Sequence, residues 1–314
     1  MQVIKLREWN EMQSLAKSKR WSKFSLTPRA MVLFVLLFAL FSIESILHKN
    51  HASIADAKNG IPYPETNRNY SSFIQAGDKN IKTIIIDAGH GGKDPGCIGH
   101  NNVFEKDIAL DIALKFGKLI EDSVKGLKVL YTRKDDKFIE LYQRAALANN
   151  NNADIFISIH CNYNPVNTLH GFESYIMGTH KTAANLEVSK RENESVLLEK
   201  DYSKNTEYGG FDPNSPESDI IFSLYQNAFM DQSARLASSV HESVKQHKVI
   251  HTKDVKQAGF LVLWKTAMPS ILIETGFLSN ANDLSLLNSE EGRKKLAHSM
   301  MLGFRNYRNW YANN

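Results

Sequence analysis

Three short apolar segments of this chain each lead into a histidine or a glutamate, and this repeated arrangement limits the folds that the chain can adopt. Residues 84–86 precede a glycine-rich loop with His90, residues 154–159 precede His160, and residues 269–273 precede Glu274. Short apolar runs rich in β-branched residues are typical of buried strands. A strand that ends in a polar loop supports that loop rigidly, so each of the three side chains is a candidate for a functional site.

Helical segments separate these strands. Apolar residues recur at helical spacing in 104–122, 141–150, 223–246, 282–287 and 290–311, and further strands are expected at 128–132 and 171–177. Strands that alternate with helices predict an α/β fold, a mostly parallel twisted sheet with helices on both faces. Ligands of such sheets bind beyond the carboxyl ends of the strands, where His90, His160 and Glu274 would meet.

The N-terminal segment differs from the rest of the chain. Its first 30 residues carry seven Lys or Arg against two Glu, and an apolar run follows at 30–43. This run is too short for a comfortable membrane span and about right for the core of an export signal. We therefore expect a basic region with a hydrophobic signal or anchor at 1–47, either cleaved or retained, a polar linker at 48–80, and an exported domain at 81–312.

The charge distribution limits the partners of that domain. The whole chain of 314 residues has a formal net charge of +4, but the basic N-terminal region alone accounts for +5, which leaves about −1 for the remainder. A nearly neutral domain offers no electrostatic argument for nucleic acid. We expect no nucleic-acid partner, and membrane contact only through the N-terminal segment.

An insert at about 178–219 interrupts the alternation of strands and helices. Residues 185–198 have a composition that allows a helix, and residues 202–216 are rich in Asn, Gly, Asp and Pro, as loops are. Connections of this length near strand ends are often lids or binding loops. The alternative is a surface insertion without a role in the site.

Four side chains could provide metal chemistry at one edge of the sheet. His90, His160 and Glu105, which opens the helix at 104–122, are two imidazoles and a carboxylate, the donor set of a catalytic zinc that keeps a position open for water. The remaining carboxylate, Glu274, could then act as a general base, and this combination hydrolyses amides.

Each of these residues also has a purely structural interpretation. Glu105 would be favoured at a helix N-terminus by the helix dipole alone. Glu274 could pair with an arginine such as Arg144, and His160 could be a hydrogen-bonded core histidine. Independent accidents would not place all four at the same edge, which favours the metal site.

The residues that flank the two histidines carry two further expectations. Cys97 and Cys161 are the only cysteines, and an exported protein could bridge them, which the sequence leaves open. We also expect that a bulky side chain at Gly91 or Gly92 would crowd both the metal and the substrate.

Four motifs resemble those of the zinc-dependent N-acetylmuramoyl-L-alanine amidases of bacterial cell-wall remodelling. They are residues 86–96 (IDAGHGGKDPG), Glu105, residues 158–162 (SIHCN) and residues 273–280 (IETGFLSN), in the family's order. The resemblance implies that His90, Glu105 and His160 bind Zn²⁺ and that Glu274 is the catalytic glutamate. It also implies the substrate, peptidoglycan, cut between the lactyl group of N-acetylmuramic acid and the L-alanine of the stem peptide.

The insert is similar to that of the cell-division amidases, in which the corresponding helix lies over the zinc until an activator displaces it. This resemblance implies an autoinhibited enzyme of cell separation, with a protein activator and a periplasmic or membrane-anchored location facing the cell wall. Of Glu187, Glu192 and Glu194, we expect Glu192 to occupy the open coordination position. Helical spacing places Glu192 and Glu194 on different faces, so both cannot reach one metal.

Two other functions remain open at this point. One is a catalytically silent peptidoglycan-binding scaffold that keeps the fold without turnover. The other is a zinc peptidase that cuts within the stem peptide, because it would use the same chemistry.

Overall fold

A computed structural model describes residues 80–179, 181–202, 205, 208 and 229–314, which belong to one compact unit, Ala76–Asn314. The predicted signal or anchor at 1–47 lies outside the described residues, as do nearly all of the predicted linker and most of 203–219. No helix in the part of the chain that is described is long and apolar enough to cross a membrane.

The described elements form an alternating α/β arrangement. The strands are β1 (Thr83–Ala88), β2 (Lys128–Tyr131), β3 (Ile155–Asn162), β4 (Phe172–Met177), β5 (Thr252–Ala258) and β6 (Ser270–Phe277). The helices are α3 (Glu105–Ser123), α4 (Leu141–Asn150), α5 (Ala183–Asn193), α7 (Met230–His247), α8 (Leu261–Trp264), α9 (Ala281–Asn288) and α10 (Glu290–Asn313), with 3-10 turns η3 (His100–Asn102) and η4 (Glu194–Leu198).

The six strands form one sheet in the order β2-β1-β3-β6-β4-β5. Among these strands, only the β4–β6 pair is antiparallel. Every residue of β3 and β6 is buried, as expected for central strands covered on both faces. The predicted mostly parallel sheet is therefore confirmed.

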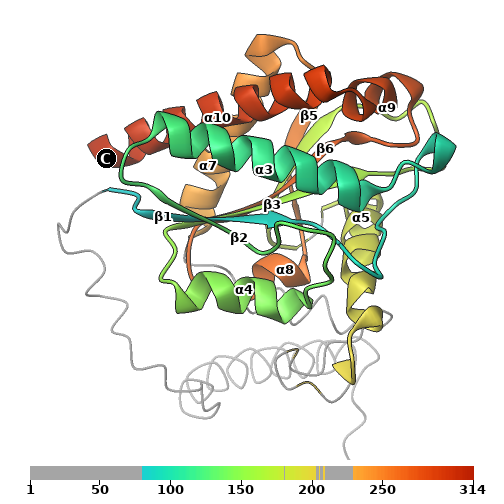
Figure 1. Cartoon of the computed structure of the whole chain (residues 1–314), viewed down its shortest axis with the longest axis horizontal. Helices are drawn as coiled ribbons and strands as arrows, with labels where there is room; N and C mark the ends of the chain where they lie inside the picture. Colours follow the sequence, from blue (N-terminus) through green and yellow to red (C-terminus); the bar gives the residue numbers. More distant parts are fainter. Residues whose placement is uncertain (1–79, 180, 203–204, 206–207, 209–228) are drawn as a thin grey trace, which may run out of the picture. The chain divides into compact units, whose positions relative to one another are not determined.

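Helices cover both faces of the sheet, as predicted (Figure 1). Ile84 and Ile86 of β1 belong to the core under α3, α7 and α10. Ile85 points to the opposite face, where α4 and α8 contribute to a second core. The alternation of side chains along a strand thus builds two apolar layers from three consecutive isoleucines.

Two elements were not predicted from the sequence. Strand β5 has the sequence TKDVKQA, and most of its residues are only partly buried because it is the edge strand of the sheet. Helix α8 is a single turn, LVLW, whose four residues are all buried. The first residues of the helix predicted at 223–246 lie outside the described part, and α7 is described from Met230.

The insert contains the predicted helix. Helix α5 begins after Thr182, whose side chain accepts a hydrogen bond from the backbone N–H of Asn185, and η4 continues it as far as Leu198. Asn193 at the end of α5 donates to the carbonyl oxygen of Gly259 and accepts from the N–H of Leu261, at 2.8 Å each. These contacts attach the insert to the segment between β5 and β6.

Candidate metal centre

Three residues singled out in the sequence meet at one buried point at the carboxyl ends of β1 and β3, with His160 in the last residues of β3 and His90 just after β1. The Nε2 of His90 lies 3.1 Å from the Nδ1 of His160, and the Oε1 of Glu105 lies 3.1 Å from each of these nitrogens. All three side chains are buried. Imidazole nitrogens and carboxylate oxygens are metal ligands, so this convergence is a candidate metal centre.

A buried ion pair fixes the loop that carries His90. Arg144 lies 2.9 Å from Asp87 and donates to the carbonyl oxygen of His90 at 3.0 Å, while Ser158 donates to the other oxygen of Asp87 at 2.6 Å. His90 has a φ of +57°, a left-handed conformation that such contacts must hold in place. The alternative in which Arg144 pairs with Glu274 is therefore wrong, because Asp87 is its partner.

Glu105 is held by two backbone groups. It is the first residue of α3, and its Oε2 accepts from the N–H of Cys97 at 2.8 Å while its Oε1 accepts from the N–H of Cys161 at 2.9 Å. Burial opposes ionisation, but the charges and hydrogen bonds of His90 and His160 together outweigh it and lower the pKa of Glu105 well below its usual range. The carboxylate is thus ionised and oriented toward the two histidines.

Asp94 selects the tautomer of His90, a role that the sequence analysis missed. Its Oδ2 lies 2.8 Å from the Nδ1 of His90, so a proton on Nδ1 leaves the lone pair of Nε2 free for a metal. Ser195 of the insert donates to the same carboxylate oxygen at 2.6 Å. Asp94 lies four residues after His90 in the same glycine-rich loop, and this short separation could have predicted their contact.

Glu274 lies beside this cluster as a carboxylate without a hydrogen-bond partner among the described residues. It is fully buried, both of its oxygens lack a partner, and it is paired in register with His160 across β3 and β6. Its nearest cation is Arg191, at 3.6 Å. Burial and the charge of Glu192 raise the pKa of Glu274 well above its usual range.

Glu192 of α5 is the fourth acidic or imidazole group at the centre. Its Oε2 lies 2.8 Å from the Nδ1 of His160 and 3.1 Å from the Nε2 of His90, and the ligand atoms of all four residues lie within 4.8 Å of one another. Glu194 is exposed. As expected, Glu192 reaches the cluster, whereas Glu194 lies on a different face of the insert.

The electrostatics of the cluster fit a divalent cation. Burial disfavours imidazolium, yet Glu105, Asp94 and Glu192 together outweigh it and raise the pKa of His90 well above its usual range. At His160, Glu192 and Glu105 together outweigh burial and raise the pKa to about 9. The site thus favours added positive charge. The Oε2 of Glu192 also has no well-formed hydrogen bond. Two nitrogen and two oxygen donors in a buried site suit zinc among the common metals.

The glycines that make room for the cluster are Gly89 and Gly96. A Cβ at Gly89 would lie 2.4 Å from the ring of His160, and one at Gly96 would lie 2.6 Å from both Glu105 and His90. The expectation for Gly91 and Gly92 was wrong, because a Cβ there would meet the loop that contains Arg133, Lys137 and Phe138 rather than the cluster.

Cys97 and Cys161 are both free thiols in the structure. The Sγ of Cys97 donates to the carbonyl oxygen of Cys161 at 3.2 Å, and the Sγ of Cys161 lies 3.2 Å from the Oγ1 of Thr275. Burial raises the pKa of both thiols well above the usual range. Their backbone N–H groups donate to Glu105 of the cluster.

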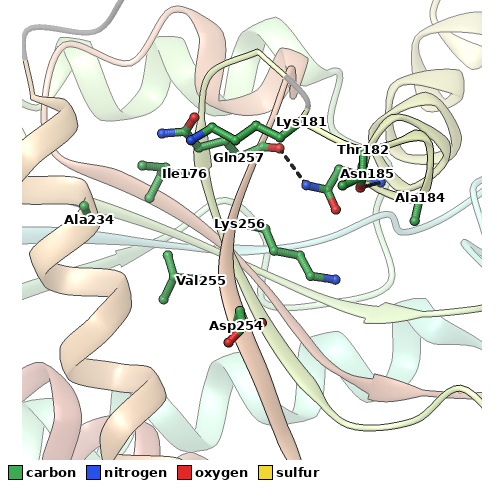
Figure 2. A pocket seen from close by; sticks show the side chains of 10 residues that line it. All are labelled: Ile176, Lys181, Thr182, Ala184, Asn185, Ala234, Asp254, Val255, Lys256 and Gln257. Atoms are coloured by element: carbon green, nitrogen blue, oxygen red, sulfur yellow. Dashed lines mark hydrogen bonds between the residues drawn. The ribbon is translucent and has the colours of Figure 1, made fainter.

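A separate pocket of about 620 Å³ lies where the start of the insert adjoins β5 (Figure 2). Lys181 and Asn185 line it from the insert, and Lys256 and Gln257 line it from β5. The side chain of Asn185 donates to the carbonyl oxygen of Gln257 at 3.3 Å. None of the four clustered residues lines this pocket, so it belongs to the attachment of the insert.

The sequence profile of the N-acetylmuramoyl-L-alanine amidases matches residues 84–306, which include every residue of the cluster. This chain belongs to that family. N-acetylmuramoyl-L-alanine amidase AmiA of Escherichia coli K12 is 29% identical over 239 residues, which cover 76% of this chain and 80% of the relative. The family assignment agrees with the resemblance of the four motifs.

Solved structures of amidases share the fold. The N-acetylmuramoyl-L-alanine amidase of Clostridium difficile 630 aligns with a TM-score of 0.54 and 28% identity over 73% of this chain and 98% of that one. The CwlD amidase of Clostridioides difficile, solved in complex with the GerS lipoprotein, aligns with a TM-score of 0.53 and 27% identity over 73% of this chain and 99% of that one.

Proposed function

We propose that this amidase hydrolyses the amide bond between N-acetylmuramic acid and the L-alanine of the peptidoglycan stem peptide, with zinc held by His90, Glu105 and His160. The main support for this proposal is the position of Glu274. This side chain is a fully buried carboxylate with no hydrogen bond to any residue that the structure describes, next to a cluster of metal-ligand atoms. A carboxylate with a raised pKa beside a metal site is suited to proton transfer.

The residues of the site divide the chemistry among them. Zinc, when bound, polarises the substrate carbonyl and lowers the pKa of a water molecule. Glu274 accepts a proton from the attacking water and returns it to the leaving nitrogen, so that it ends the cycle as it began. Asp94 keeps the proton of His90 on Nδ1, and the N–H groups of Cys97 and Cys161 keep Glu105 in place.

We further propose that α5 holds the enzyme inactive. The Oε2 of Glu192 lies against the ring nitrogens of both His90 and His160, and the neighbouring Arg191 lies 3.6 Å from Glu274. One helix end thus covers both the metal ligands and the general base. Substrate could reach the site only if this end of α5 moved away.

The insert has a second attachment at the N-terminus of α4, which supports the same proposal. Glu199 accepts from the N–H of Leu141 at 2.6 Å, and Tyr208 donates to Glu199 at 2.6 Å. The N–H of Tyr142 in turn donates to the hydroxyl of Tyr208 at 3.1 Å. Glu199 therefore caps a helix whose own N-cap residue makes no side-chain hydrogen bond.

An activating protein partner is part of this proposal, because each attachment of the insert must be broken for turnover. The complex of CwlD with a lipoprotein is a precedent for an amidase of this fold that binds a protein partner. We also propose that zinc is the physiological metal, that the domain faces the cell wall after export, and that the enzyme acts in cell separation.

Purified peptidoglycan, treated with the zinc-loaded full chain and analysed by mass spectrometry, tests the proposed activity. The amidase reaction releases stem peptides with a free L-alanine amine, and Glu274→Gln should slow their release by about 10²- to 10⁴-fold while zinc still binds. Shortened stems that remain on the sugar would identify a peptidase instead. No product, even with Glu192→Gln, would favour the silent scaffold.

A further inference from the structure

Arg191 occupies a small pocket of hydrogen-bond acceptors next to the general base. Its Nη1 donates to the carbonyl oxygen of Tyr163 at 2.8 Å, its Nη2 donates to the Oδ1 of Asn162 at 3.0 Å, and its Nη2 lies 3.6 Å from Glu274. These three oxygens come from β3, the residue that follows it, and β6. When the end of α5 moves away, the oxygens of Tyr163 and Asn162 lose this donor and Glu274 loses its neighbouring cation.

We propose that these three oxygens form the subsite for the leaving amine of the stem peptide, and that Arg191 fills this subsite in the resting enzyme. The inference rests on the proposed function and deepens it, because it assigns Asn162 and the Tyr163 carbonyl to substrate recognition. It also gives Arg191 a role distinct from that of Glu192, which lies at the metal ligands.

The side chain of Asn162 is held so that its oxygen faces the subsite. Its Nδ2 donates to Glu173 at 3.2 Å, and its Oδ1 also accepts from the N–H of Tyr163 at 2.8 Å. Glu173 is itself fixed by Lys256 at 2.8 Å and by the hydroxyl of Tyr175 at 2.7 Å. Reversal of the amide would place an NH₂ group against Arg191, so the oxygen stays in the pocket.

The chemistry of the reaction requires a group of this kind. Hydrolysis breaks the carbonyl carbon–nitrogen bond and forms a carbon–oxygen bond to water, and the nitrogen receives a proton through Glu274. At neutral pH the products are a carboxylate and a primary ammonium, which together account for every atom and charge of the amide and the water. An ammonium has three N–H donors and no acceptor, and the pocket offers three acceptor oxygens.

The resting structure therefore holds a cation of this chain where the reaction generates a cation of the product. Glu274 is fully buried, and within the described part of the chain neither of its oxygens is hydrogen-bonded. A buried carboxylate without a partner is costly, and a bound amine would supply the missing donor. The same geometry explains why a guanidinium, rather than an apolar side chain, precedes Glu192.

Calorimetric titration of the zinc-loaded full chain with methylguanidinium chloride tests the subsite without turnover. Arg191→Ala should bind this probe at least about tenfold more tightly than the wild type, whose own guanidinium fills the pocket, since one hydrogen bond to a charged group has about that effect. Equal binding by the two proteins would overturn the inference. Because no hydrolysis is needed, this result is independent of the proposed activity.

Two further variants on the Arg191→Ala background test whether Asn162 binds the probe directly or only supports the position of Glu173. Asn162→Ala should weaken binding of methylguanidinium about tenfold, by removing one acceptor. Tyr175→Phe removes a hydrogen bond of Glu173 but leaves the subsite intact. The Arg191→Ala protein with this added change should therefore bind methylguanidinium with the same affinity as Arg191→Ala alone. If Tyr175→Phe weakened binding as much as Asn162→Ala, Asn162 would act only through the support of Glu173, and the inference would fail.

Competition between the product and methylguanidinium tests whether the subsite binds the leaving amine. L-Alanyl-D-isoglutamine has the free amine of the cleaved stem, and its N-acetyl derivative lacks it. The free amine should displace methylguanidinium from Arg191→Ala, and the acetylated peptide should not. Displacement by both peptides, or by neither, would overturn the assignment, and this comparison needs no substitution at Asn162.

Discussion

Neutralisation of Glu192 should raise the basal activity of the full chain. The change Glu192→Gln keeps the size of the side chain but removes a buried charge that lies 2.8 Å and 3.1 Å from the ring nitrogens of His160 and His90. A hydrogen bond to a charged group contributes about 2 kcal/mol, which corresponds to roughly a thirtyfold change in an equilibrium constant. Arg191 loses its ion pair with Glu192, but its bond to Tyr163 and that of Asn193 to Gly259 remain, so α5 should still form and dock.

The measurement is the initial rate at which free-amine stem peptides are released from purified peptidoglycan. Glu192→Gln should release them about thirty times faster than the wild type, as long as the open state stays the minor one. Glu194→Gln is the matched control, because Glu194 is exposed two residues further along the insert. Glu194→Gln should release stem peptides at the same rate as the wild type.

Two results would refute this reasoning. A rate of Glu192→Gln equal to that of the wild type would show that the carboxylate does not restrict access. An equal increase for Glu192→Gln and Glu194→Gln would show that any loss of charge loosens the insert. Zinc content must be measured in all three proteins, since the account predicts that His90, Glu105 and His160 retain the metal without Glu192.

Other substitutions test separate parts of the account. Glu274→Gln should lower hydrolysis by about 10²- to 10⁴-fold, the range for loss of a general acid–base group, with unchanged zinc binding by equilibrium dialysis. Gly96→Ala should weaken zinc binding in the same assay, because the added methyl would meet two of the ligands and the φ of +65° disfavours alanine. Asp87→Asn should lower the free energy of unfolding in urea by about 3 kcal/mol, because it leaves Arg144 buried without its counter-ion. Glu173 is buried, yet the charge of Lys256 holds its pKa below the usual range. It therefore stabilises the fold above the unfolded pKa of about 4.3, and this contribution is lost as the pH falls through the folded pKa. Glu173→Gln should accordingly flatten the acid side of the curve of Tm against pH.

The central strands and the helices that flank them could be predicted from the sequence because their apolar patterns are strong. Strands β3 and β6 are continuous buried runs, and α3 begins at Glu105 as its apolar spacing indicates. Strand β5 could not be predicted, since an edge strand is half exposed and its sequence, TKDVKQA, lacks an apolar pattern. Its identity as a strand depends on pairing with β4, which is distant in sequence.

Some residues of the candidate site could likewise be predicted from the sequence, and others could not. His90, His160 and Glu274 follow apolar strands, so the topology of a parallel sheet brings them to one edge. Arg191 carried no comparable indication, and Asn162 stood out only as the last residue of the motif at 158–162, because the contact between them arises only when the insert folds back over the site. The two adjacent insert residues also point to different groups, and helical spacing alone does not say which group each one reaches.

The most direct test of the central claim is a crystal structure of the zinc-loaded wild-type chain with anomalous data at the zinc absorption edge. We expect one anomalous peak bonded to the Nε2 of His90, the Nδ1 of His160 and an oxygen of Glu105, with an oxygen of Glu192 as the fourth ligand. A peak at any other place, or a peak at this site with α5 displaced and Glu192 directed away from the metal, would contradict it.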